Sequence, residues 1–184
     1  MHQLFNTFPS IDDRPWEPGM TSQRTLIVGI GSPHGDDRIG WLAIDRLRDE
    51  VSPEIVIRQA STPSQLFDWI DGFDCVIVCD ACEGVDNEPL SPIVHRWEWP
   101  TTEVEHMRSS DSHTFGLPAV LELAEKLDKL PKCVIIYGMA GKRFDAFADI
   151  SPEVNAGLRN LVEMIACELN SAASETPLGA VDHA

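Results

Sequence analysis

Short apolar runs rich in valine and isoleucine recur along the chain and predict the strands of a buried sheet. Runs without polar alternation are typical of parallel strands that are covered on both faces. A further run, Ile93–Trp99, alternates apolar and polar residues, which predicts an edge strand with one solvent-exposed face and leaves an antiparallel direction open. The four continuous runs are Leu26–Ile30, Ile55–Ile57, Cys75–Cys79 and Cys133–Tyr137.

Segments with helical spacing fill the gaps between these runs. Their apolar residues fall in 39–47, 66–70, 117–127 and 154–169. Thr62–Pro63 and Ser151–Pro152 precede two of them, and proline suits the first turn of a helix. Because strand and helix alternate and crossover connections are short and right-handed, we expect an α/β fold. The prediction is a three-layer α/β/α sandwich with a mostly parallel sheet of about five strands.

The two ends of the chain differ from its middle. Residues 1–24 carry proline, aspartate and scattered aromatic residues without a period, and residues 171–184 are small and polar. We therefore predict a loosely ordered N-terminal extension over 1–24 and a flexible C-terminal tail over 171–184. Residues 25–170 form the expected single domain, since 184 residues suit one globular core.

The net charge of the chain argues against some classes of binding partner. There are 14 basic and 30 acidic residues, a formal net charge of -16. This opposes attraction to phosphate backbones and anionic lipids, so no nucleic-acid partner is expected. The first residues lack a basic start with an apolar run, and nothing approaches the roughly 20 apolar residues of a membrane span. We expect a cytoplasmic protein without a membrane partner, monomeric by default.

The cysteines are best interpreted as reduced core residues. The chain has five, and an odd number inside strand-like runs does not suggest a disulfide framework. Cys79-Asp80-Ala81-Cys82 has the spacing of a redox pair or of half a zinc site. The sequence has no second such pair, and residues 83–86 are predicted as loop rather than helix. Structural thiols are favoured over a sulfur ligand.

The first predicted strand runs into the turn GIGSPHGDD, which ends in the acid pair Asp36 and Asp37. G-x-G after a strand is typical of dinucleotide sites. Here the third glycine is displaced, the second strand ends in Arg58-Gln59-Ala60 without an acid for a ribose, and the acid pair would repel phosphate. A nucleotide site is the weaker alternative, and the glycines more simply permit a tight turn.

Candidate metal ligands follow three of the predicted strands. Asp36 and Asp37 follow the first, Asp80 ends the run CVIVC, and His113 precedes the third helical segment. Carboxyl ends of parallel strands meet at one edge, and carboxylates with an imidazole suit Zn, Ni, Fe or Mn. The positive end of the helix that follows His113 disfavours a charged imidazole, which keeps the ring neutral for metal binding. The alternative is that the acids are helix caps and His113 an ordinary loop residue.

Two other parts of the sequence lie near the candidate metal ligands. His34 stands two residues before Asp36 and is able to approach the same site. Residues 99–111 form a polar segment long enough for a mobile substrate-binding loop, and an ordinary surface loop explains it equally well.

These pieces, taken in order, resemble the hydrogenase maturation endopeptidases, which trim the carboxyl-terminal extension from the large-subunit precursor of a nickel–iron hydrogenase. The resemblance covers most of residues 25–169. It departs from the family at Ser32, where asparagine is usual, and at Arg38, where a small residue is common. The matching motifs are GIGSPHGDDRIG, the strand VIVCDA, SHTFGL, and the strand and loop YGMAGKRFDAFADISPEV.

The resemblance implies specific roles. Asp37, Asp80 and His113 would bind nickel already inserted in the precursor, and another divalent metal such as zinc or cadmium would substitute for it. Asp36 or a ligand carboxylate would assist proton transfer during cleavage. The implied partner is the hydrogenase large-subunit precursor. The alternatives are a non-proteolytic metal-site chaperone and a nucleotide-binding α/β protein.

Overall fold

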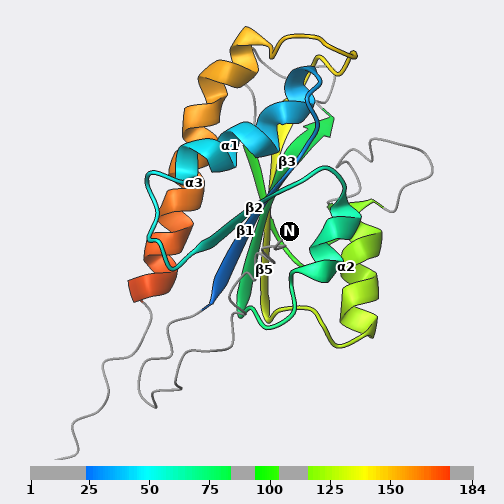
Figure 1. Cartoon of the computed structure of the whole chain (residues 1–184), viewed down its shortest axis with the longest axis vertical. Helices are drawn as coiled ribbons and strands as arrows, with labels where there is room; N and C mark the ends of the chain where they lie inside the picture. Colours follow the sequence, from blue (N-terminus) through cyan, green and yellow to red (C-terminus); the bar gives the residue numbers. More distant parts are fainter. Residues whose placement is uncertain (1–23, 84–93, 104–115, 175–184) are drawn as a thin grey trace, which may run out of the picture.

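The computed structural model describes residues 24–83, 94–103 and 116–174 (Figure 1). Its elements, in chain order, are β1 (Thr25–Ile30), the 3-10 helix η1 (Gly35–Arg38), α1 (Ile39–Leu47), β2 (Val56–Ala60), the 3-10 helix η2 (Pro63–Asp68), β3 (Cys75–Glu83), β4 (Val94–Glu98), α2 (Leu117–Lys126), β5 (Cys133–Gly141) and α3 (Pro152–Ser174).

The strands form one sheet in the order β2-β1-β3-β5-β4. The pairs β1–β2, β1–β3 and β3–β5 are parallel, whereas β4 is an edge strand antiparallel to β5. The last pair between β1 and β3 is Gly29 with Cys79, but β3 continues beside β5 through Glu83. The carboxyl end of β3 therefore projects past β1, and Asp80 is its first residue beyond that ladder.

Helices cover both faces of the sheet (Figure 1). Ile27, Ile77 and Ile135 share a buried cluster with residues of α1 and α3. Their chain neighbours Leu26 and Val76 point the other way, into a cluster with residues of η2 and α2. Because side chains alternate along a strand, continuous apolar runs are needed to fill both layers. The predicted three-layer sandwich with a mostly parallel five-stranded sheet is confirmed.

Two glycines let α1 lie directly on the sheet. A Cβ atom on Gly29 would overlap the carbonyl oxygen of Gly40, and one on Gly40 would overlap that of Ile30. The backbone of α1 therefore rests on the end of β1 without an intervening side chain. This contact fixes the start of α1, and with it η1, at the carboxyl edge of the sheet.

Two elements differ in detail from the sequence prediction. The helical segment after Thr62 is the 3-10 helix η2, whose start is closed by a capping box between Thr62 and Gln65. The helix α3 continues to Ser174, past the boundary expected at residue 170. Residues 1–23 and 175–184 lie outside the described residues, so the predicted loose ends remain predictions.

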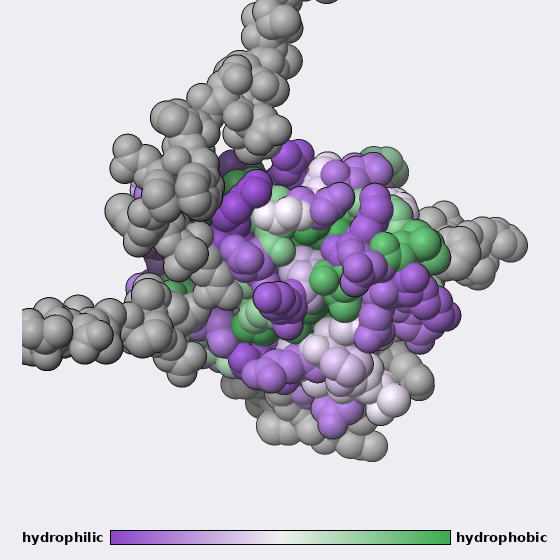
Figure 2. Space-filling view, turned by 90° about the horizontal axis from the view of Figure 1, so that it is seen from below, coloured by the Kyte–Doolittle hydropathy of each residue, from purple (hydrophilic) through white to green (hydrophobic). Residues whose placement is uncertain are grey.

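Hydrophilic residues dominate the end of the molecule seen from below, with smaller apolar areas between them (Figure 2). None of the helices in the described part of the chain is long and apolar enough to cross a membrane.

Candidate active site

The turn between β1 and η1 places the acid pair at the carboxyl edge of the sheet. Ser32 N–H donates to the Asp37 carbonyl at 3.1 Å, and Asp37 N–H donates to the His34 carbonyl at 3.1 Å. A Cβ atom on Gly31 would overlap the Asp37 carbonyl oxygen, so this tight closure requires glycine. Gly35 opens η1 with a φ of 51°, a conformation that also favours glycine.

Asp36 is fully buried, and its carboxylate is occupied by backbone groups. Its Oδ2 accepts hydrogen bonds from the N–H groups of Lys142 at 2.8 Å and Arg143 at 2.9 Å. Its Oδ1 accepts one from Ser151 N–H at 2.7 Å. Asp36 thus fixes both ends of the loop between β5 and α3, which we call the 142–151 loop. These contacts favour a positioning role, and the predicted part of Asp36 in proton transfer remains a prediction.

Asp37 and Asp80 come close enough for their charges to interact. Asp80 is 4% exposed, and its Oδ1 accepts a hydrogen bond from Ala81 N–H at 2.8 Å. Burial raises the pKa of Asp80 well above its ordinary value, the bond from Ala81 opposes this, and the negative charge of Asp37 raises it further. A cation between the two carboxylates would relieve both the repulsion and the desolvation.

The third predicted ligand, His113, lies outside the described residues. The helix that follows it in the chain, α2, begins at Leu117 and covers the face to which Val78 and Cys82 point. Strand alternation places Asp80 on that same face. Within residues 24–83, 94–103 and 116–174, no three His, Cys, Asp or Glu side chains lie near enough to one another to hold a metal ion.

His34 points to the 142–151 loop. Its Nδ1 accepts a hydrogen bond from Phe147 N–H at 3.2 Å, and the two rings meet edge to face with centroids 5.4 Å apart. Phe147 itself is 90% exposed and has a φ of 64°. Sequence reasoning missed Phe147, because a positive φ is normally signalled by glycine or asparagine.

The C-x-x-C motif is divided between the two faces of the sheet. The strand β3 extends through both cysteines to Glu83, where a loop had been expected. Cys79 belongs to the cluster under α1 and α3, whereas Cys82 belongs to the cluster under α2. Burial raises the pKa of Cys82 to about 12 and that of Cys79 further. Thiols on opposite faces cannot pair, so their contacts support the interpretation as structural thiols.

The fold and this edge of the sheet define an α/β/α sandwich protein with buried aspartates, Asp36 and Asp80, and several solved structures share this fold. The chain matches the hydrogenase maturating endopeptidase HybD from E. coli with a TM-score of 0.67 and 21% identity, over 81% of this chain and 93% of that one. It matches the [NiFe] hydrogenase maturation protease HybD from Thermococcus kodakarensis with a TM-score of 0.59 and 22% identity, over 79% and 98%.

A third match is the [NiFe] hydrogenase maturation protease HycI from Thermococcus kodakarensis KOD1, with a TM-score of 0.58 and 21% identity over 80% of this chain and 93% of that one. No protein-family model matches the sequence, and no curated protein matches it. The chain has the fold of the hydrogenase maturation endopeptidases, and the resemblance drawn from its motifs is confirmed at that level.

Proposed function

We propose that this protein is an endopeptidase that removes the C-terminal extension from the nickel-loaded large-subunit precursor of a nickel–iron hydrogenase. The observation that supports the proposal is that the charge of Asp37 acts on Asp80 at the carboxyl edge of the sheet, where open α/β sheets bind their ligands. These carboxylates come from two different strand ends of a fold shared with maturation proteases. An acidic pair at this place suits a cation rather than a phosphate.

In this proposal the nickel is cargo of the precursor, and Asp37, Asp80 and His113 contact it during docking. Zinc or cadmium in the same position would offer similar ligand chemistry. Asp80 accepts a hydrogen bond from Ala81 N–H, and because burial raises its pKa, protons compete with an arriving cation for this carboxylate more than they do at an ordinary aspartate. Docking therefore strengthens as the pH rises through the pKa of Asp80.

The same contacts make insertion of nickel a condition for cutting. A nickel ion beside the scissile peptide can polarise its carbonyl or activate a water molecule. The turn that Gly31 closes positions the backbone of Asp37, and Asp36 holds the neighbouring loop, so this part of the site is preorganised before the substrate arrives. A precursor without nickel lacks the ion that these groups would contact and stays uncut.

The test is the intact mass of the nickel-loaded precursor from the same organism after incubation with the purified chain. We expect the loss of one short C-terminal peptide with the wild type and no loss with Asp37→Ala, Asp80→Ala or His113→Ala. Asp49→Ala, which removes an exposed aspartate after α1, is the matched control and should cleave normally.

Each result separates the alternatives. Comparable turnover by all variants would rule out the assigned residues. Binding of the precursor without shortening would instead indicate a metal-site chaperone. If the chain neither bound nor cut the precursor but was stabilised by a nucleotide, it would be a nucleotide-binding protein.

A further inference from the structure

The 142–151 loop is mounted on the same turn that presents Asp37. Gly35 N–H donates to the Ala148 carbonyl at 2.9 Å, and Asp36 N–H donates to the Arg143 carbonyl at 2.7 Å. The carboxylate of Asp36 accepts three further hydrogen bonds from backbone N–H groups of the loop. The loop and η1 therefore form one hydrogen-bonded unit, which positions the loop relative to the turn that carries Asp37.

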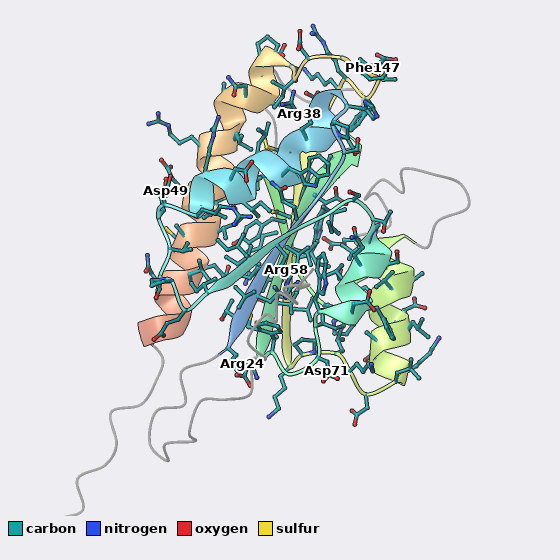
Figure 3. All side chains as sticks on the ribbon, in the orientation of Figure 1. Arg24, Arg38, Asp49, Arg58, Asp71 and Phe147 are labelled. Atoms are coloured by element: carbon teal, nitrogen blue, oxygen red, sulfur yellow. The ribbon has the colours of Figure 1, made fainter. Side chains whose placement is uncertain are left out.

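Phe147 is the exposed tip of this unit. Figure 3 shows it at the end of the molecule where Arg38 closes η1, opposite the end marked by Asp71. Its φ of 64° lies in the left-handed region, which L residues other than glycine, asparagine and aspartate seldom adopt. Its ring is 90% exposed, so the fold gains little burial from a phenylalanine at this position. Local stability alone would favour glycine or asparagine here.

Phe147 also contacts His34, which lies on the turn that presents the acid pair. The bond from Phe147 N–H to His34 Nδ1 fixes the backbone, and the edge-to-face contact with the imidazole supports the ring. Among the described residues, the other exposed large apolar side chains are Leu123 and Leu127, on and after α2. α2 leads into β5, so Leu127 lies toward the amino edge of the sheet, away from the acid pair.

We propose that Phe147 is a docking residue for the polypeptide substrate, the hydrogenase precursor. An apolar side chain of the precursor packs against the Phe147 ring while the nickel site of the precursor faces Asp37 and Asp80. This inference rests on the proposed function. An aromatic side chain has few rotatable bonds to order on binding, and it is the type of residue that dominates binding energy in interfaces. The hydrogen bonds from Phe147 to His34 and from η1 to the loop connect Phe147 to the turn that carries the acid pair.

The experiment measures both the affinity for the nickel-loaded precursor and its cleavage, using the full chain. Phe147→Ala removes the ring, and Phe147→Asn removes it while accommodating the positive φ. Both variants keep the N–H that donates to His34, so the loop retains its support. Phe147→Tyr keeps the ring as the conservative variant, and Leu127→Ala is the matched control for loss of an exposed apolar side chain.

We expect Phe147→Ala and Phe147→Asn to weaken precursor binding and raise KM about tenfold, with kcat nearly unchanged. Phe147→Tyr and Leu127→Ala should behave as the wild type. If the wild type cleaves and both ring-free variants show its KM and affinity, the docking role is overturned and the protease role stands.

The other outcomes are equally decisive. Binding that depends on Phe147 without any cleavage supports docking and overturns the protease role. A wild type that neither binds nor cleaves the precursor overturns both.

Discussion

Asp36→Asn is the substitution whose effect follows most directly from the structure. In the wild type, Oδ2 accepts two backbone hydrogen bonds and Oδ1 accepts a third from the buried Ser151 N–H. An asparagine oxygen can keep the two bonds from Lys142 and Arg143. Its NH2 group then faces Ser151 N–H, so that two donors oppose each other and a buried N–H is left without an acceptor.

The cost can be worked out from these contacts. Loss of one hydrogen bond to a charged acceptor costs about 1.5–3 kcal/mol, and the remaining two bonds become weaker because their acceptor is neutral. We expect the free energy of unfolding to fall by about 3 kcal/mol. For an m-value of about 2 kcal/mol/M, the urea midpoint would drop by about 1.5 M.

Urea denaturation of the purified variants measures this change. The control is Asp49→Asn, which alters an exposed aspartate (Figure 3) and should stay within about 0.5 kcal/mol of the wild type. Asp36→Asn within that same margin would refute the view that this carboxylate holds the 142–151 loop.

Three further substitutions test other contacts. The free energy of unfolding of Asp80→Asn should depend less on pH than that of the wild type. Between the ordinary aspartate pKa and the raised pKa of Asp80, wild-type stability should fall by up to about 1.4 kcal/mol per pH unit as the pH rises. Parallel pH profiles of the two proteins in urea unfolding would contradict this. Gly40→Ala should lose about 3 kcal/mol, because its Cβ would push α1 off β1; an unchanged urea midpoint would exclude that close approach. Glu168 accepts bonds from Arg96 and from the Tyr137 hydroxyl, and Arg96 lowers its pKa. Glu168→Gln should therefore lower the free energy of unfolding by about 1 kcal/mol near neutral pH. The difference from the wild type should shrink as acid protonates Glu168, and a difference that stays constant across pH would count against this prediction.

Much of the fold is predictable from the sequence because strands buried on both faces carry continuous apolar runs. The runs that begin at Leu26 and Cys133 mark β1 and β5, and the alternating Ile93–Trp99 marks the edge strand β4. The full length of β3 was not predictable, since Asp80 interrupts its apolar pattern. Its pairing with β5 through Glu83 is a tertiary contact that has no local signal.

The site was predictable only in part. Parallel strands share a carboxyl edge, which predicts that Asp37 and Asp80 lie near each other, and the effect of the Asp37 charge on Asp80 agrees with this. Asp36 and Asp37 look equivalent in sequence, but backbone donors more than a hundred residues away occupy Asp36. The fixed aromatic Phe147 depends on the same distant loop, so neither its backbone conformation nor its partner His34 has a local sequence signal.

The proposed role of Asp37 and Asp80 as sensors of a cation carried by another protein is tested most directly by nickel dependence. The measurement is the initial rate of tail loss, followed by intact mass, for the same precursor with and without nickel in the presence of the wild-type chain. We predict that the nickel-loaded precursor loses its C-terminal peptide while the nickel-free precursor stays intact. Equal rates of shortening for the two precursors would contradict this role.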